Sequence, residues 1–448
     1  MSIVSYDVEV LNVNKKLRDT VANTLAIYNS ALNYVCNVVK ERFNEIKDLN
    51  LQYQKQYIEK LIHNTKNNKA EYDFDALFYK LPSYLRRDIQ ARAVGHISSF
   101  KSNLDNYNKE KYEKISNGKK FKKKEPTLGN CNVLPTFYKG SMFTEITNNR
   151  INLKLFVDNT WKFISFKLKP RDLKYINQIN GKRYNPTIRI VGKKIFVRFS
   201  FEVEALKLSD KKINDQIICG VDLGINNAAT LSIMDAKGTI KGRHFVHTCD
   251  IDLLNHLLNK KKKIQRNSGN YKYLGKLHIV NKINSLNDNI VNYTCSEIIK
   301  ICLSYGVDVI VFENLRHKFK KAKKCFRQKF HHWRKRSIYN KATAIAHRNG
   351  MRISTVNPAG TSKYAFDGSG EVKRDNTNYS ICTFASGKRY NSDLSASYNI
   401  AARYIVRSII KPLDENSRLD LETKASLSLS GTKVTYHTLM ELLKVTTV

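Results

Sequence analysis

The sequence predicts a multidomain protein of the α/β plus α+β class, with a helical region and a β-rich segment ahead of an α/β core. Three observations support this prediction. At 448 residues, the chain can form two or three domains of about 150 residues each. Hydrophobic residues make up 42% of it, enough for a substantial core. Between residues 217 and 413, short apolar strands alternate with helical patterns, the order typical of a mixed sheet flanked by helices.

The N-terminal region begins with one predicted strand and continues as helix. Residues 2–11 alternate apolar and polar side chains, the period of a strand. From Leu17 to Val39 the apolar residues recur every three or four positions, which predicts a helix packed along one face. More helix is predicted up to about Tyr112, with one helix beginning at Pro82 and Ser83.

A basic loop and a β-rich segment follow. The loop, Asn117–Pro126, carries five candidate phosphate-binding side chains, although a solvated turn is an equally good interpretation. These side chains are Lys119, Lys120, Lys122, Lys123 and Lys124. Residues 128–205 alternate like strands, and Gly192 with Lys193 predicts a hairpin turn. The charged stretch 208–216 predicts a domain boundary.

Beyond this linker the pattern is that of the α/β core. The apolar run "IICGVDLG" (217–224) and the segment after it predict two strands, with a turn near Gly238. Residues 251–305 predict helix, and "VDVIVFENL" and "MRISTVNP" predict two further strands. After about residue 413 the pattern weakens, and "KASLSLSGTK" (424–433) predicts a loose tail.

The charge balance points to a polyanionic partner. The chain has 78 Lys and Arg against 39 Asp and Glu, a formal net charge of +39. Nucleic acid is therefore the first expected partner and acidic lipid the second. No apolar run approaches the roughly 20 residues of a membrane span, and the N-terminus lacks a signal-peptide layout. The eight cysteines include no C-x-x-C, which favours a reducing, cytoplasmic location.

Three carboxylates occupy unusual positions in the sequence. Asp222 lies in an apolar strand, Glu313 closes another, and Asp393 opens a helix rich in small residues. A carboxylate next to a buried strand is costly unless it is paired or binds a cation. Such a trio, meeting at one edge of a sheet, is suited to hard divalent cations such as Mg²⁺, and a pair of these ions can promote phosphodiester hydrolysis.

Each of the three also has a simpler interpretation. Asp222 could form a turn with Gly224, or it could be the phosphate-site aspartate of an actin-like ATPase. The ATPase would also need a second D-x-G strand and a glycine-rich adenosine loop, and neither is found. Glu313 could merely end a strand. Asp393 taken alone is best explained as a helix N-cap, because Asp accepts hydrogen bonds from free N–H groups there.

Three motifs resemble those of the RuvC-like RNA-guided nucleases, meaning the compact type V CRISPR effectors and the transposon-encoded TnpB proteins. "GVDLGINNAATLSI", "VIVFENL" and "NSDLSASYNIA" are similar to that family's first, second and third RuvC motifs. On these positions Asp222, Glu313 and Asp393 match the catalytic carboxylates. The resemblance implies an RNase H-like core, Mg²⁺ bound as two ions, a guide RNA, and double- and single-stranded target DNA.

The resemblance also implies a domain organisation and a setting. A wedge domain, an oligonucleotide-binding-like β-barrel, would comprise residues 1–14 and 128–208, with a helical recognition lobe at 15–127. The RuvC-like nuclease domain would span 209–413, and residues 414–448 would form a C-terminal tail. The implied location is the cytoplasm of a prokaryote, and the implied state is a monomer or a homodimer without membrane contact.

One part of the nuclease domain departs from the family pattern. At about 361–392 most transposon-type relatives have a zinc-binding knuckle with two C-x-x-C pairs. The four matching positions here are Ala365, Gly368, Thr383 and Ser386, and Cys382 is one place out of register. One thiol cannot supply a four-ligand zinc site, so we expect no structural zinc. Cys382 is then expected to be a small buried hydrophobe, and the knuckle to be held by packing or to be mobile.

Further nucleic-acid contacts are expected from basic residues of the same domain. Residues 316–341 contain twelve Lys and Arg and no acid, interleaved with aromatic side chains. We expect Arg334, Lys335, Arg336 and Arg389 to contact phosphates, and Trp333 to pack in a core.

The sequence thus predicts an RNA-guided DNA endonuclease that also recognises a short flanking DNA motif. The alternatives are a repressor-like RNA-guided binding protein with weak or no cleavage, an actin-like ATPase, and a guide-free resolvase or transposase. The motifs do not separate a CRISPR effector from a transposon-encoded nuclease.

Overall fold

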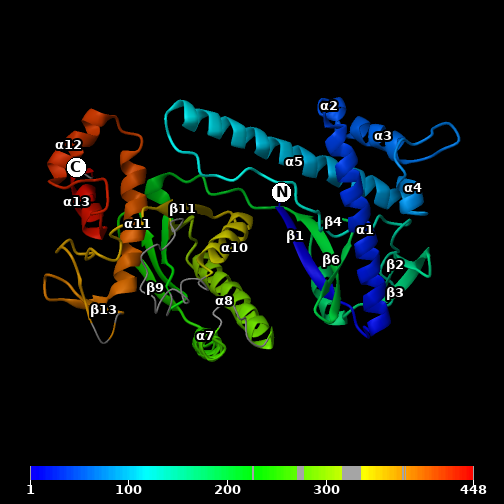
Figure 1. The fold of residues 1–448 in the computed structure, drawn as a ribbon. Helices are drawn as coiled ribbons and strands as arrows, with labels where there is room; N and C mark the ends of the chain where they lie inside the picture. Colours follow the sequence, from blue (N-terminus) through cyan, green and yellow to red (C-terminus); the bar gives the residue numbers. More distant parts are fainter. Residues whose placement is uncertain are drawn as a thin grey trace. The chain divides into compact units, whose positions relative to one another are not determined.

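The computed structural model describes residues 2–224, 227–269, 277–314, 334–375, 378 and 380–446. The chain folds as a mixed α/β protein with two compact units, Met1–Glu204 and Ala205–Val448 (Figure 1). None of the helices in the described part is both long and apolar enough to cross a membrane.

The helices of the first unit follow the predicted apolar periodicity. They are α1 (Lys15–Glu41), α2 (Phe43–Ile46), α3 (Leu51–Ile62), α4 (Phe74–Leu77) and α5 (Ser83–Ser116). Asn14 caps α1 by accepting a hydrogen bond from the Leu17 backbone N–H at 2.7 Å. The predicted stripe of α1 is buried, and Tyr28 within it donates to Asp88 of α5 at 2.6 Å. The long helix α5 begins at Ser83, as predicted.

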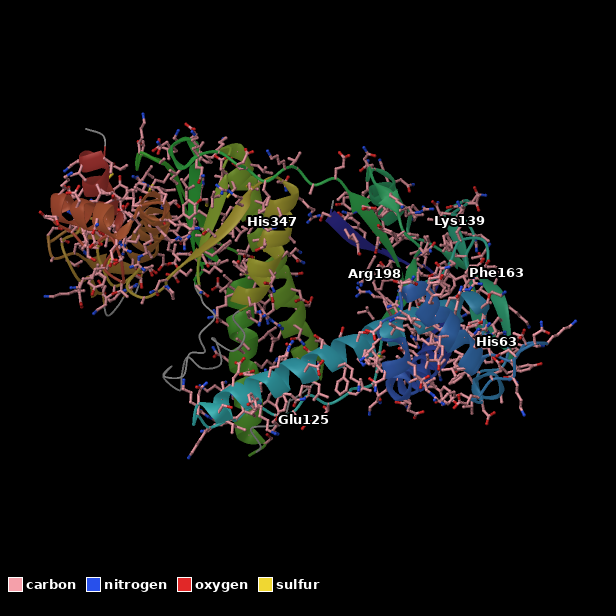
Figure 2. All side chains as sticks on the ribbon, turned by 90° about the horizontal axis from the view of Figure 1, so that it is seen from above. His63, Glu125, Lys139, Phe163, Arg198 and His347 are labelled. Atoms are coloured by element: carbon pink, nitrogen blue, oxygen red, sulfur yellow. The ribbon has the colours of Figure 1, made fainter. Side chains whose placement is uncertain are left out.

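The strands of the first unit form two separate sheets. The elements are β1 (Ser2–Glu9), β2 (Arg150–Val157), β3 (Thr160–Lys167), α6 (Pro170–Asn177), β4 (Lys182–Arg183), β5 (Thr187–Val191) and β6 (Lys194–Val203). Strand β6 pairs with β1 on one side and with β4 and β5 on the other, and β2 pairs with β3. The hairpin predicted at Gly192 is present between β5 and β6. In Figure 2, Arg198 lies on β6, where it pairs with Asp7 of β1 at 2.9 Å.

The expected barrel is not found. Within the described residues, the sheet of β1, β4, β5 and β6 does not close on itself. The two sheets are joined through an isolated bridge between Val10 and Leu168 rather than through a continuous ladder. A barrel requires every edge strand to find a partner around the ring. Here β2 and β3 form ladder pairs only with each other, so the strands of this unit remain two open sheets.

The second unit is built on a five-stranded mixed sheet. Its strands are β7 (Ile217–Asp222), β8 (Ala229–Asp235), β9 (Ile240–Val246), β10 (Val309–Glu313) and β11 (Arg352–Val356), in the spatial order β11-β10-β7-β8-β9. Strands β7, β8 and β9 are antiparallel neighbours, and the predicted turn at Gly238 joins the last two. Strand β10 runs parallel to both β7 and β11. The carboxyl ends of β7 and β10 therefore meet at one edge of the sheet.

Helices cover both faces of this sheet. They include α7 (Asp250–Asn267), α8 (Leu277–Ser304), α10 (Lys335–Arg348), α11 (Ser392–Ile410), α12 (Glu415–Ala425) and α13 (Tyr436–Thr446), with a short 3₁₀ turn η1 (Ile213–Asp215) before β7. On one face, Val221 and Ile310 pack in a core with α8 and α10. On the other face, Ile218 and Val311 pack with α11 and α13 (Figure 1). Burial on both faces explains why β7 and β10 read as continuous apolar runs.

The segment after residue 413 is not a loose tail. Leu439 and Leu442 of α13 are fully buried in the same core as α11. Of the predicted "KASLSLSGTK" stretch, Lys424 and Ala425 end α12, and the remaining residues lie in the irregular connection between α12 and α13. The tail was misjudged because α13 is short and its apolar face finds its partner only in the tertiary fold.

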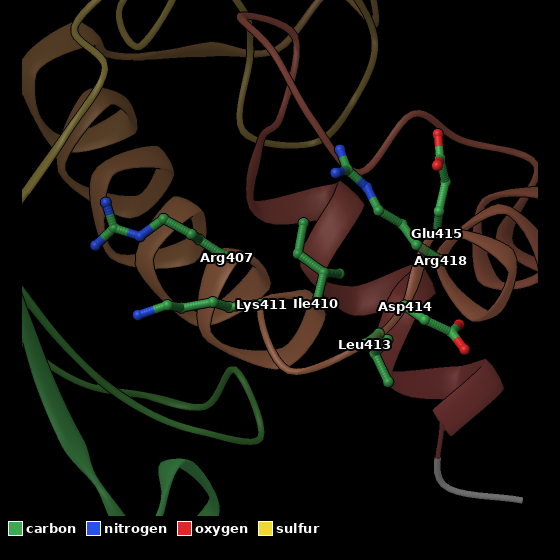
Figure 3. A pocket seen from close by; sticks show the side chains of 7 residues that line it. All are labelled: Arg407, Ile410, Lys411, Leu413, Asp414, Glu415 and Arg418. Atoms are coloured by element: carbon green, nitrogen blue, oxygen red, sulfur yellow. The ribbon is translucent and has the colours of Figure 1, made fainter.

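A shallow pocket of about 390 Å³ lies where α11 ends and α12 begins (Figure 3). Arg407 is held there by its hydrogen bonds to the Thr355 carbonyl at 2.8 Å and to Ser354 Oγ at 2.7 Å. In Figure 3 the Arg407 and Lys411 side chains point to one side and Glu415 to the other. The charged groups do not converge on a common point, so we do not consider this pocket a candidate binding site.

Candidate active site

Two of the three candidate carboxylates are the last residues of neighbouring parallel strands. Asp222 ends β7 and Glu313 ends β10. The register pairs Val221 with Phe312, so the next residue of each strand is the carboxylate. Parallel strands in this register place both side chains at the same edge of the sheet.

A glycine allows helix α11 to bring the third carboxylate to this edge. A Cβ atom on Gly220 would lie 2.3 Å from the Ser397 carbonyl oxygen and 2.9 Å from the Ala401 nitrogen. Such a contact is impossible, so only glycine lets the backbone of α11 rest directly on β7. Ser397 and Ala401 are fully buried at this contact. The small residues of α11 are therefore packing residues, and they bring the start of the helix, with Asp393, toward Asp222.

The helix cap is Asn391 and not Asp393. The Asn391 side-chain oxygen accepts hydrogen bonds from the backbone N–H groups of Asp393 at 3.0 Å and Leu394 at 2.9 Å. This corrects the simpler interpretation of Asp393, which is the second residue of α11. Its carboxylate accepts from Ser392 Oγ at 3.4 Å and is otherwise not needed for capping. Because Asn391 caps the helix, the Asp393 carboxylate remains available to bind a cation.

The electrostatics show that the three carboxylates influence one another. Burial, followed by repulsion from Glu313 and Asp393, holds the pKa of Asp222 well above its usual range, and Arg374 partly offsets the effect. Burial also raises the pKa of Glu313, against the opposing hydrogen bond from Thr361. For Asp393, burial raises the pKa and Arg374 lowers it. Three half-buried acids that resist ionisation form a cluster that a cation would stabilise.

Cationic side chains of the same unit stand close to this cluster. Arg374 lies on the short strand β12 (Lys373–Arg374), donates to Ser392 Oγ at 2.5 Å and influences both Asp222 and Asp393. Lys335, at the start of α10, has its pKa lowered by burial, an effect that Glu313 opposes. Lys335 was expected to contact phosphate, and the structure places it beside the Glu313 carboxylate.

A buried arginine of α11 organises the loops around Glu313. Arg403 is 6% exposed and donates to the carbonyl oxygens of Asn357 at 2.6 Å, Ala359 at 2.9 Å, Thr432 at 2.6 Å and Val434 at 2.9 Å. These bonds fix the loop that leaves β11 and the segment that leads into α13. Burial lowers the pKa of Arg403, and the nearby Glu313 opposes that shift.

The loop after β11 supplies a hydroxyl to the same carboxylate. Thr361, 2% exposed, donates a hydrogen bond from Oγ1 to Glu313. Its backbone carbonyl accepts from Asn399 Nδ2 of α11 at 2.9 Å. Sequence reasoning missed the roles of Thr361, Arg374 and Arg403. The "TS" at 361–362 was the one available signal, because it belongs to the motif resemblance described above.

The carboxylates at this edge suit divalent cations that share them as ligands. They do not suit a single ion enclosed by all three side chains. Within the described residues, no three His, Cys, Asp or Glu side chains are grouped closely enough to enclose one ion. Mg²⁺ does not require such a cage, since it keeps several waters and is usually bound by one or two carboxylates together with substrate phosphates. Three hard oxygen donors whose burial disfavours the ionised form match that donor set.

The expected knuckle is a small three-stranded sheet with a packed interior. Strand β13 (Ile381–Thr383) pairs with β12 and with β14 (Arg389–Asn391). Cys382 is fully buried, as predicted, and its thiol donates to the Tyr390 carbonyl at 3.5 Å. Ala365 is also fully buried beside it. Ala365 therefore places a methyl group in an apolar core at one of the four positions where the resemblance implies a thiolate.

The predicted nucleic-acid contacts lie on exposed surfaces in both units. The five lysines of the loop after α5 are all exposed, and Lys123 pairs with Glu110 at 2.8 Å. Arg334 and Arg336 are exposed near the start of α10. Arg389 is exposed on β14 and pairs with Asp375 at 3.4 Å. The aromatic-rich part of the basic segment, including Trp333, lies outside the described residues.

Comparison with known proteins gives partial matches. A model of the Aq_aa04 family matches residues 4–157, less than half of the chain. No curated protein matches the sequence.

Similar solved structures include several Cas12-type CRISPR proteins. The Cas12f1–sgRNA–target DNA complex is 15% identical with a TM-score of 0.32, covering 90% of this chain and 99% of that one. The mini-RNA-guided endonuclease CRISPR-Cas_phi3 is 10% identical with a TM-score of 0.42, covering 91% and 92%. Alicyclobacillus acidoterrestris C2c1 in complex with single-guide RNA is 10% identical with a TM-score of 0.41, covering 86% and 67%. At these values the functional argument depends on the residues of this chain.

Proposed function

We propose that this protein is an RNA-guided DNA endonuclease that hydrolyses phosphodiester bonds at the Asp222–Glu313–Asp393 edge of the second unit. One observation carries the proposal. Three carboxylates from segments far apart in the chain lie half-buried at one edge of the sheet, and they raise the pKa of Asp222 together with burial. Structural acids are normally paired, whereas burial raises the pKa of all three of these acids, and a bound cation would stabilise their ionised forms.

The chain's own residues define the roles in such a site. Asp222, Glu313 and Asp393 would hold Mg²⁺, most simply as two ions that share them. When bound, these ions would activate a water molecule and neutralise charge on the scissile phosphate. Arg374 lies within electrostatic reach of Asp222 and Asp393, and Lys335 within reach of Glu313, so these two cations would attract and orient the DNA backbone. Thr361 would keep the Glu313 carboxylate in one orientation through its hydrogen bond.

Two features support a guide RNA and a target DNA as partners: the charge of the chain and the motif resemblance. A net charge of +39 is a large surplus for a chain of this length, and neutralisation by nucleic acid would relieve it. The RNase H-like interpretation of the second unit agrees with its sheet order and strand directions. Sequence specificity would come from pairing between guide and target, while the protein would bind the backbone and a short flanking motif.

The decisive experiment compares wild type with Asp222→Ala. Both proteins should copurify with RNA and bind target DNA equally well, and only wild type should cut it in the presence of Mg²⁺. If both bind and neither cuts, the protein is an RNA-guided binder and the nuclease proposal is wrong. Sequencing of the copurified RNA identifies the guide, and its absence would refute the RNA-guided part.

Arg374 offers a second, finer test. Arg374→Ala should lower the cleavage rate about 100-fold, the usual cost of removing one preorganised electrostatic contact to a transition state. DNA affinity should change little, since one contact among many contributes little to binding. Lys363→Ala is the matched control, because Lys363 lies in the same knuckle but is exposed and paired with Glu371.

A further inference from the structure

Five aromatic rings occupy the interior where relatives of this knuckle hold a metal. Phe366 lies at their centre, with ring centroids 5.0 Å from Tyr390, 5.2 Å from Tyr398, 5.5 Å from Phe384 and 6.1 Å from Tyr436. Most of these pairs are edge-to-face, the arrangement that aromatic quadrupoles favour. Three rings belong to the knuckle, Tyr398 belongs to α11, and Tyr436 is the first residue of α13.

Helix α13 is tied to the knuckle and to α11 by backbone hydrogen bonds. The His437 N–H donates to the Phe366 carbonyl at 2.9 Å. The Tyr436 N–H donates to Asn399 Oδ1 at 2.9 Å, and its hydroxyl donates to the Gly238 carbonyl at 2.8 Å. The first turn of α13 therefore joins the knuckle, α11 and the β8–β9 turn.

The same contacts extend to the residues beside the carboxylates. Asn399, fully buried on α11, donates through Nδ2 to the carbonyls of Thr361 at 2.9 Å and Tyr364 at 3.0 Å, while its oxygen is held by Tyr436. Arg374 of the knuckle donates to the Ser362 carbonyl at 3.3 Å. Displacing α13 would release the loop that presents both Thr361 and Arg374 to the site.

We propose that residues 432–446 position the knuckle, and with it Arg374 and Thr361, against the carboxylates in place of a structural metal. The metal-free character of the knuckle follows from its buried apolar interior, and the ring cluster supplies the cross-link. The catalytic consequence rests on the proposed nuclease function. The positioning itself does not, so the two can be tested separately.

Cys382 provides a reporter of the knuckle that does not depend on activity. Its thiol is fully buried in the knuckle, so alkylation requires local opening. The full-length protein is treated with iodoacetamide in Mg²⁺ buffer, with or without a zinc-selective chelator, and labelling is followed for each cysteine peptide by mass spectrometry. We expect Cys382 of wild type to stay protected, and the chelator to have no effect.

The variants then separate positioning from general folding. Tyr436→Ala should speed Cys382 labelling by at least about tenfold, as expected for a lowered cost of local opening. Tyr436→Phe, which keeps the ring and loses only the hydroxyl bond to Gly238, should label far more slowly than Tyr436→Ala, and Lys444→Ala, an exposed position of α13, should behave like wild type. Cys36 and Cys295, buried elsewhere, should keep their rates in every variant. If Tyr436→Ala also exposes them, Tyr436→Leu, which keeps an apolar side chain without the ring, gives the deciding measurement.

Two results would overturn the inference. One is faster Cys382 labelling of wild type in the chelator, which would reveal a metal in the knuckle. The other is an unchanged Cys382 rate in a folded Tyr436 variant that lacks the ring. For cleavage, Tyr436→Ala should lower kcat, expressed per molecule of DNA-binding-competent protein, and leave target-DNA affinity within about twofold; this normalisation removes the effect of a smaller folded fraction. A wild type that does not cut refutes the nuclease proposal, and the labelling result still decides the positioning.

Discussion

Asp222→Asn should make the second unit more stable while abolishing its response to Mg²⁺. In the free protein, burial and the charges of Glu313 and Asp393 disfavour an ionised Asp222. Asparagine has nearly the same shape and no charge, so the substitution removes this penalty. It also removes an oxygen ligand with full negative charge, so it should weaken binding of the divalent ion.

The way in which folding stability changes with pH follows from the direction of the pKa shift. A carboxyl whose pKa is raised by folding binds its proton more tightly in the folded state. Its favourable contribution is present below the pKa of the unfolded chain and is lost as pH rises toward the higher folded value. The stability gain of Asp222→Asn over wild type should therefore be largest at about pH 7–8. It should shrink as the solution is acidified toward the ordinary Asp pKa of about 3.9.

The expected changes in stability follow from the relief of one unfavourable charge and from the linkage between Mg²⁺ binding and folding. Relieving one unfavourable charge commonly stabilises a protein by about 0.5–2 kcal/mol. For an ion that binds with a Kd of about 1 mM, 10 mM Mg²⁺ adds about 1.4 kcal/mol to wild type, from RT ln(1 + [L]/Kd). In a unit of this size, each kcal/mol moves Tm by about 2–4 °C. Wild type should thus gain about 3–6 °C with Mg²⁺ and the variant less than about 1 °C.

Differential scanning calorimetry of the full-length protein, with and without Mg²⁺, measures both shifts. Asp308→Asn is the matched control, because Asp308 is a buried carboxylate of the same unit that is paired rather than clustered. It accepts from Ser209 Oγ at 2.8 Å and from the Ile217 N–H at 2.9 Å, and it pairs with Lys211 at 3.0 Å. Asp308→Asn should lower Tm and keep the Mg²⁺ response. The reasoning is refuted if Asp222→Asn lowers Tm in the same way or retains the full Mg²⁺ shift.

Three other substitutions test the supporting structure. Gly220→Ala should cost about 1–3 kcal/mol in urea unfolding and abolish cleavage, because the new methyl group overlaps the Ser397 carbonyl; normal stability would contradict the close contact. Asn391→Ala should cost about 1 kcal/mol through loss of the cap and should reduce cleavage, whereas an unchanged Tm would argue against its capping role. Lys120→Gln should lower the salt dependence of nucleic-acid binding by about one unit of slope, and Lys123→Gln, whose charge is already paired with Glu110, by less; equal slopes for wild type and both variants would exclude this loop from the interface.

Local patterns were sufficient to predict most elements of the fold. The apolar stripe of α1, the runs of β7 and β10, the turns at Gly192 and Gly238 and the burial of Cys382 are all present in the structure. These features depend on side-chain periodicity and on backbone geometry over a few residues, which the sequence displays directly. The open sheets of the first unit were missed, because barrel closure depends on how distant strands pair.

The candidate site shows the same division. Asp222 and Glu313 could be recognised individually, because a carboxylate at the end of an apolar strand is unusual. Asp393 could not be separated from a helix cap until the structure showed that Asn391 fills that role. The contribution of Arg374 depends on a strand of the knuckle lying beside carboxylates from three distant segments, a proximity with no local sequence signal.

The sequence alone therefore determined the charge of the protein, the order of its secondary elements and the identity of three unusual acids. The tertiary structure decided which acid is free of capping, which cations stand beside the cluster, and that α13 packs against the core and the knuckle. The physical reason is that periodicity and propensity act between near neighbours in the chain. Burial, mutual repulsion of the acids and the contacts of the Tyr436 ring act between residues that only folding brings together.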